Sequence, residues 1–332
     1  MRTFSSKLLL LVAAFLFAVT ACGGDDESSD GGQATVVVTT NILGDVVRGV
    51  AGNLVTVETI MPAGADPHVF QASAKQVDLM MKADLLISNG EDFEEGLIDV
   101  LASASEDGVP VFEAMFHVRA LEFDEDDHDD HADHDDHAGH NHSGIDPHFF
   151  TDPLQMVEVV EALVDFMIAN VSGIDADQLR ASGQSYVQQL QDLHNEIQEL
   201  FEAVPLGKRV LVTNHEVFNY FAEQYDFELV GTVIPSLSTT DSASAKQLTE
   251  LIEVIEKNNV PAIFADVASS DRLAAMIAEE IGDIDVVNLY SESLGEAGSG
   301  ASTYLDMLRT NYERIATALA ADDHDHDHDH DH

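Results

Sequence analysis

Short runs of β-branched and apolar residues alternate along this chain with longer stretches in which apolar residues recur at helical spacing. The runs have the length of buried strands, and the stretches between them have the period of amphipathic helices. Such alternation is typical of parallel sheets whose strands are connected by helices, so we expect an α/β fold. The expected strands are 35–40, 55–60, 85–88 and 109–112 in the first half, and 209–213, 228–233, 262–265 and 285–289 in the second.

Helices are expected between these strands. The first begins at Ile42 with Asn41 as its cap, because asparagine favours that position. The others are expected at 74–81, 93–102, 217–225, 245–258, 272–281 and 302–319, with one more after Pro153.

A longer helical pattern covers residues 177–203. Its apolar residues recur at intervals of three, four or seven and define one face: Leu179, Val187, Leu190, Ile197, Leu200 and Phe201. At 1.5 Å per residue this helix spans roughly 40 Å, enough to run along two domains. We therefore expect an N-terminal lobe at 34–176, a linker helix at 177–204 and a C-terminal lobe at 205–321. Each lobe holds a parallel sheet flanked by helices, and a single rigid connector restricts hinge motion between them.

The N-terminus has the layout of an export signal. Arg2 and Lys7 precede an apolar run, 8–19, that is too short to cross a bilayer. The run leads into Val-Thr-Ala-Cys, which resembles the signal of bacterial lipoproteins, so we expect a signal peptide at 1–21 and a lipid on Cys22. The alternative is an ordinary signal with an incidental cysteine. Cys22 is the only cysteine, which excludes an internal disulfide, and residues 22–33 are expected to form a flexible tether.

Charge then narrows the possible partners. A formal net charge of −48 excludes nucleic acid, which requires a basic surface. Two acidic segments rich in histidine, 122–142 and 322–332, contribute part of this charge. We interpret both as weak, auxiliary metal-collecting segments, although a merely solvated charge run would have the same composition. The histidines of the first segment that are candidate ligands are His128, His131, His134, His137, His140 and His142.

Four chemical groups each follow a predicted strand. The tripeptide Asp-Pro-His occurs twice, ending at His68 and at His148; the third group is His215 and the fourth is Glu292. A lone histidine is usually structural. Two of these groups come from each lobe, however, and the carboxyl ends of parallel strands are where open α/β folds bind ligands. Three imidazoles and one carboxylate suit Zn²⁺ in tetrahedral geometry, and a cleft between the lobes would let them converge.

These motifs resemble those of the zinc and manganese solute-binding proteins of bacterial ABC importers, specifically the zinc branch. The resemblance covers residues 35 to 320 and rests on the two Asp-Pro-His elements, on His-Glu-Val-Phe-Asn-Tyr-Phe at 215–221 and on Leu-Tyr-Ser-Glu-Ser-Leu-Gly at 289–295. It implies two lobes joined by one long helix, with the ion bound in the cleft by His68, His148, His215 and Glu292. It also implies an exported, membrane-anchored monomer that delivers its ion to a permease and is not an enzyme.

Zinc is the expected ion, with manganese as the alternative. Relatives that prefer manganese tend to have a carboxylate at the position of His215, and harder ions favour carboxylates. The family usually has aspartate where this chain has Glu292, which leaves the fine metal preference open.

Neighbouring residues have two possible roles. Asp66 and Asp152 are expected either to orient ligand imidazoles or to cap loops. Asp266 either lines the cleft or caps a helix, and His117 and His194 are expected to be structural.

Two other classes of protein share some of these features. A zinc protease would need a histidine at position 219, where this chain has Asn219. A surface adhesin or zinc buffer could use the same fold without an importer.

Overall fold

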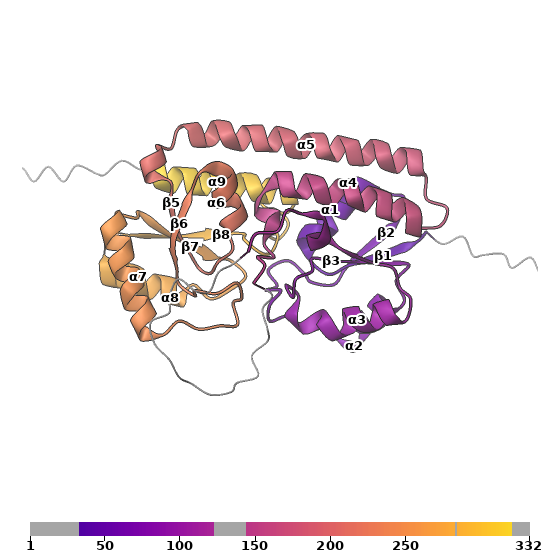
Figure 1. Cartoon of the computed structure of the whole chain (residues 1–332), viewed down its shortest axis with the longest axis horizontal. Coiled ribbons are helices and arrows are strands. Elements are labelled where there is room, and N and C mark those ends of the chain that lie inside the picture. Colours follow the sequence, from indigo (N-terminus) through magenta and orange to yellow (C-terminus); the bar gives the residue numbers. More distant parts are fainter. Residues whose placement is uncertain (1–32, 123–143, 283, 321–332) are drawn as a thin grey trace, which may run out of the picture. The chain divides into compact units, whose positions relative to one another are not determined.

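The computed structural model describes residues 33–122, 144–282 and 284–320. The described residues form two parallel four-stranded sheets, and Figure 1 shows them side by side. The first sheet has the order β2-β1-β3-β4 and consists of β1 (Thr35–Val38), β2 (Thr56–Thr59), β3 (Leu85–Ser88) and β4 (Val111–Glu113). The second has the order β6-β5-β7-β8 and consists of β5 (Val210–Thr213), β6 (Glu228–Thr232), β7 (Ala262–Asp266) and β8 (Asp285–Leu289). The predicted two-lobed α/β fold is confirmed, and both sheets have the same strand order.

Helices connect the strands within each lobe. In the first lobe these are α1 (Asn41–Ala51), α2 (Ala74–Met81), the 3₁₀ turn η1 (Glu95–Leu97) with α3 (Ile98–Glu106), and η2 (Ala114–His117) after β4. In the second lobe they are η5 (Leu206–Lys208), α6 (Asn219–Tyr225), α7 (Ala245–Asn258) and α8 (Arg272–Ile281). The equivalent helices α2 and α7 both begin with a Ser-x-x-Gln capping box, in which each side chain satisfies a backbone N–H of the other residue.

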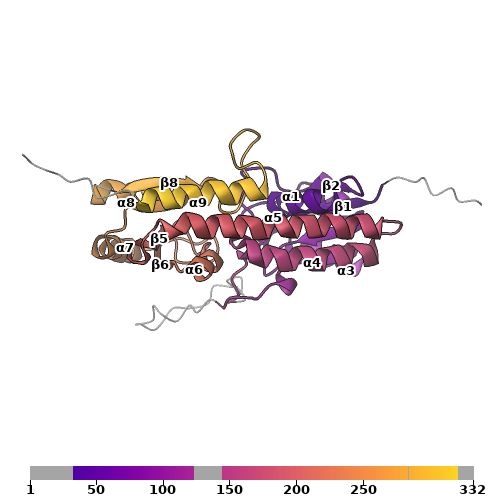
Figure 2. The same ribbon diagram turned by 90° about the horizontal axis from the view of Figure 1, so that it is seen from above.

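Three long helices cover both sheets on one side. They are α4 (Pro153–Asn170), which follows η4 (Phe149–Thr151), α5 (Ala176–Glu202) and α9 (Tyr304–Ala320). Helix α5 packs on α1 and α4 of the first lobe and on α9 of the second, as Figures 1 and 2 show. Its 27 residues span roughly 40 Å at 1.5 Å each. The predicted connecting helix is therefore present.

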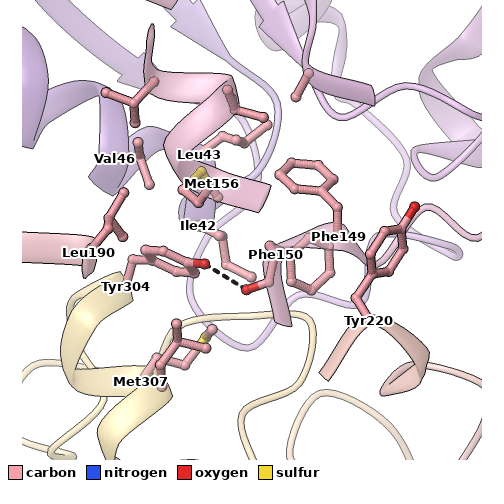
Figure 3. Packing of buried hydrophobic residues seen from close by; sticks show 14 of the residues in the cluster. Ile42, Leu43, Val46, Phe149, Phe150, Met156, Leu190, Tyr220, Tyr304 and Met307 are labelled. Atoms are coloured by element: carbon pink, nitrogen blue, oxygen red, sulfur yellow. Dashed lines mark hydrogen bonds between the residues drawn. The ribbon is translucent and has the colours of Figure 1, made fainter. Parts of the chain in front are cut away.

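The hydrophobic core continues from one lobe into the other beneath these helices. Figure 3 shows Ile42 of α1, Leu190 of α5 and Tyr304 of α9 in the same cluster. The hydroxyl of Tyr304 donates a hydrogen bond to the carbonyl of Phe150 at 2.7 Å. A shared apolar core of this kind holds the two lobes together on the side away from the polar loops.

Two helix starts differ from the predictions. Thr40, rather than Asn41, caps α1, because its hydroxyl accepts the N–H of Leu43 at 3.3 Å. Asn41 instead connects the lobes: its amide nitrogen donates to Ser293 Oγ, and its carbonyl oxygen accepts the N–H of Leu294, both at 2.8 Å. The helix expected from residue 93 begins as the 3₁₀ turn η1 and becomes α-helical only at Ile98.

Several predictions lie outside the described residues. These are the signal peptide at 1–21, the lipid on Cys22, nearly all of the tether at 22–33, the histidines at 128, 131, 134, 137, 140 and 142, and the tail at 322–332. Within the described part of the chain, no helix combines the length and apolar character needed to cross a membrane.

Candidate metal centre

The four groups singled out in the sequence converge on one point. Oε1 of Glu292 lies 2.8 Å from Nε2 of His68, 3.2 Å from Nε2 of His215 and 3.3 Å from Nε2 of His148. One potential ligand atom from each group lies within 4.8 Å of all the others. All four side chains are buried, with 4% of His68, 2% of Glu292 and none of the two remaining histidines exposed.

Strand ends explain the positions of three of the four groups. His68 lies in the loop after β2, His215 two residues after β5 and Glu292 three residues after β8. The expectation that His148 also follows a strand is wrong: it immediately precedes η4, and the described part of the segment before it forms only an isolated bridge between Glu122 and Ile145. Because the strands of each sheet are parallel, their carboxyl ends lie at one edge, and the two edges meet between the lobes.

Both Asp-Pro-His tripeptides form the same local turn. In the first, Oδ1 of Asp66 accepts the backbone N–H of His68 at 2.9 Å. In the second, Oδ1 of Asp146 accepts the backbone N–H of His148, also at 2.9 Å. Each aspartate thereby fixes the backbone from which its histidine projects, and the proline between them restricts φ.

The second nitrogen of each imidazole has a different environment. Nδ1 of His148 lies 2.7 Å from Oδ1 of Asp146, and Nδ1 of His68 lies 3.2 Å from Oε1 of Glu95. Among the described residues, Nδ1 of His68 and Nδ1 of His215 form no hydrogen bond, so the His68–Glu95 contact is an ion pair without hydrogen-bond geometry. A carboxylate hydrogen-bonded to Nδ1 favours the tautomer in which Nε2 is free to bind an ion, so the ring of His148 is held ready for ligation, while Glu95 contacts the ring of His68 through charge alone.

Glu95 and Asp146 were not identified from the sequence. Asp146 could have been, since it occupies the same place in its tripeptide as Asp66. Glu95 could not, because it is one of many acidic residues and only the fold brings it to His68.

Asp66 and Asp152, the two predicted partners, bind backbone groups. The contact of Asp66 with His68 is to the backbone N–H, and its Oδ2 accepts from Thr239 at 2.7 Å. Oδ1 of Asp152 accepts the N–H of Leu154 at 2.8 Å and caps α4. Asp152 therefore starts a helix, whereas Asp66 closes the turn that carries His68.

Other predicted neighbours lie as follows. Asp266 ends β7, is buried and accepts hydrogen bonds from the hydroxyl of Ser291 and the N–H of Ala268, so it supports the residue next to Glu292. Its burial raises the pKa to about 7. The cap of α8 is Asp271, not Asp266.

The histidines outside the cluster, His117 and His194, lie in structural contacts. His117 stacks on Phe112 at a ring-centroid distance of 4.7 Å, and a ring nitrogen of His194 lies 3.1 Å from the hydroxyl of Tyr225.

Charges within the cluster are strongly coupled. Burial raises the pKa of Glu292, but the imidazoles of His215 and His68 lower it more, and it ends well below its usual range. Burial lowers the pKa of His68, but Glu292 and Glu95 raise it further, to about 10. The pKa of His148 is also raised, by Asp146 and Glu292 against burial, whereas burial keeps that of His215 low. Without a metal ion, the imidazoles of His68 and His148 therefore hold protons beside an anionic Glu292, and a metal cation can replace those protons.

The geometry and surroundings suit a small divalent cation. Two ligand atoms of a tetrahedral ion, each 2.0–2.1 Å from it, lie roughly 3.3 Å apart, close to two of the three distances at Glu292. Phe93 packs edge-on against His68 and His148, with ring centroids 5.2 and 5.6 Å away. An apolar wall excludes water and strengthens electrostatic attraction within the site.

Comparisons with known proteins agree with this geometry. Residues 36–318 match the family model described as zinc-uptake complex component A, periplasmic. Similar relatives include the manganese-binding lipoprotein MntA of Halalkalibacterium halodurans, 26% identical over 281 residues, covering 84% of this chain and 86% of the relative. The zinc-binding protein TroA of Treponema pallidum is 27% identical over 289 residues, covering 85% of this chain and 87% of TroA. A solved structure of the periplasmic zinc-binding protein TroA superposes with a TM-score of 0.75 at 26% identity, covering 87% of this chain and 100% of that one.

Proposed function

Because this chain belongs to the family of periplasmic zinc-uptake components, we propose that it is an extracytoplasmic receptor that binds zinc and delivers it to the permease of an ABC importer. The observation that carries the proposal is the buried convergence of three imidazole nitrogens on one carboxylate oxygen. We assign His68, His148, His215 and Glu292 as the ligands.

The ligand set favours zinc over manganese. Relatives of this chain are named for zinc and for manganese, so family membership does not decide between the two metals. Three imidazoles and one carboxylate match the borderline softness of Zn²⁺, whereas Mn²⁺ prefers a set richer in oxygen. The buried Oε2 of Glu292 has no hydrogen-bond partner among the described residues, so a bidentate carboxylate is available to a larger ion. We therefore expect the site to bind zinc more tightly than manganese but not to exclude manganese.

Binding without catalysis follows from the same arrangement. Catalytic zinc sites have three protein ligands and an open position for water, whereas four protein groups surround the proposed ion here. Release then requires a change in the protein itself, which we assign to docking on the permease.

Location and zinc capture are proposed from the N-terminal segment, from the acidic segment within the first lobe and from the C-terminal tail. Several relatives are named as lipoproteins, which supports a lipid on Cys22 and a protein anchored outside the cytoplasm. The segments 122–142 and 322–332 would raise the local zinc concentration through weak, exchanging sites.

A competition titration tests the proposal. Zinc and manganese are each titrated into the chain in the presence of a chelator strong enough to keep the weak histidine sites empty. We expect one tight zinc site, much weaker manganese binding, and loss of the tight site in His215→Ala. His117→Ala is the matched control, because it removes an imidazole that lies outside the cluster, and it should bind as the unmodified chain does. Tight binding that survives His215→Ala but disappears when 123–142 and 322–332 are deleted would instead indicate a zinc buffer.

A further inference from the structure

A short segment of the second lobe, residues 236–241, is bound to the first lobe beside His68. The hydroxyl of Ser238 donates to Oε1 of Glu95 at 2.5 Å, and the hydroxyl of Thr239 donates to Oδ2 of Asp66 at 2.7 Å. Both carboxylates also hold His68: Glu95 lies 3.2 Å from the ring Nδ1, and Asp66 accepts the backbone N–H. The same two carboxylates therefore accept hydrogen bonds from the second lobe and contact the proposed ligand His68.

Local packing fixes the position of Glu95. It begins the turn η1, and the next residue is Gly96. A Cβ at Gly96 would lie 2.1 Å from the carbonyl oxygen of Phe70, so only glycine lets the turn approach the chain just after His68 this closely. Glu95 is consequently held next to the imidazole by the backbone and not only by its own side chain.

Ser238 is fixed as well. Its Oγ lies 2.7 Å from Oγ1 of Thr240 and accepts the N–H of the same residue at 3.1 Å. Only 1% of Ser238 is exposed, so its hydrogen bond with Glu95 is shielded from water. A shielded hydrogen bond to a carboxylate is stronger than one at the surface.

This contact also lies beside a small cavity at the edge of the site. A cavity of about 10 Å³, enough for a single water, is bordered by His68, Glu95, Phe93 and Leu237. Leu237 belongs to the 236–241 segment, so movement of that segment would widen the opening next to His68.

We propose that Glu95 is a positioning residue that couples ion binding at His68 to the attachment of the 236–241 segment. Its Oε1 forms an ion-pair contact with Nδ1 of His68, whose Nε2 lies against Glu292, and the same oxygen accepts the hydrogen bond from Ser238 of the opposite lobe. Loss of the Ser238 contact leaves the ring less constrained and its edge more open, so the ion leaves faster. This inference rests on the proposed function, since it takes the ion to be zinc bound at the four assigned ligands.

The test measures zinc dissociation from the full chain after mixing with excess chelator, together with the absorption spectrum of the cobalt-loaded protein. Glu95→Ala should weaken zinc binding about 10- to 100-fold, the range typical of residues that orient metal ligands, and shift the cobalt bands. Glu95→Gln keeps an oxygen acceptor and should restore most of the affinity. Ser238→Ala, which touches no ligand, should speed dissociation about three- to tenfold, as expected for one lost hydrogen bond.

Glu91→Gln is the matched control. It removes the same charge from a residue that borders the same cavity, and it should leave both the dissociation rate and the spectrum unchanged. An equal effect in this variant would attribute the loss to charge alone and overturn the assignment to Glu95.

The remaining outcomes separate the inference from the proposed function. Failure of the unmodified chain to bind zinc would refute the function, whereas normal binding and release in Glu95→Ala would refute only the coupling. If Glu95→Ala fails to fold, as circular dichroism of the metal-free protein would show, Ser238→Ala decides, and an unchanged dissociation rate in that variant overturns the proposal.

Discussion

The two Asp-Pro-His turns have the same sequence and the same backbone hydrogen bond, but they support their imidazoles differently. In both, Oδ1 of the aspartate accepts the backbone N–H of the histidine at 2.9 Å. In both, Oδ2 accepts a hydrogen bond from the second lobe, from Thr239 to Asp66 and from Asn219 to Asp146. The ring of His148 then contacts its own aspartate, whereas the ring of His68 contacts Glu95.

The same local motif can therefore hold its imidazole in two different ways. The second turn concentrates three tasks on Asp146: it fixes the backbone, orients the ring and binds the other lobe. The first turn divides them between Asp66 and Glu95. The first imidazole therefore depends on two separate carboxylates, and both are attached to the segment at 236–241.

Removing either imidazole is expected to cause the largest loss of zinc affinity, and the loss should be similar for the two turns. His68→Ala and His148→Ala should each weaken zinc binding by more than about 100-fold, beyond the range typical of orienting residues, because each deletes a proposed ligand. Competition with a chelator of known affinity measures this loss. His194→Ala serves as the control, and near-normal affinity in either ligand variant would remove that residue from the site.

Removing the aspartates should separate the turns. Asp146→Ala is expected to weaken zinc binding about 10- to 100-fold because it frees the ring of His148. Asp66→Ala should weaken zinc binding less, because the ring of His68 keeps its contact with Glu95. The same competition titration compares the two variants. Equal losses would mean that the backbone bond, which the turns share, matters more than the ring contact.

Acid should release the ion from both turns. The pKa values of His68, at about 10, and of His148 are raised, so the empty site binds protons below those values and zinc must displace them. Apparent affinity should therefore fall as pH falls, by about tenfold per pH unit for each proton displaced. Calorimetry at neutral pH in two buffers of different ionisation enthalpy counts these protons. A count of zero would contradict the raised pKa values.

The smallest effect is expected on the apolar side of the second turn. Tyr304→Phe removes the hydrogen bond to the carbonyl of Phe150 and should lower the free energy of unfolding by about 1 kcal/mol. Zinc affinity should change less than twofold, because no ligand is displaced. Urea denaturation of the metal-free protein gives the first value and chelator competition the second. A large loss of affinity would show that the shared core, and not only the polar contacts, positions His148.

Local patterns were sufficient to predict the alternating strands and helices, the long connector and the four groups that converge. Strand and helix periods are set by neighbouring residues, and a parallel sheet brings the ends of its strands to one edge whatever the rest of the chain does. The repeat of Asp-Pro-His indicated two of the candidate ligands, and the structure shows that each tripeptide is closed by a hydrogen bond over two residues.

Only the tertiary structure decided which groups support these ligands. Glu95 meets His68 from 27 positions away and Ser238 from 143 positions away, so neither contact leaves a trace in local sequence. Asn41 occupies a position typical of a helix cap but joins the first lobe to Ser293 of the second. Asp152 caps a helix, whereas Asp146 orients an imidazole. Aspartate and asparagine can satisfy many donors equally well, and the donor that each one meets is determined by the packing of segments far apart in the chain.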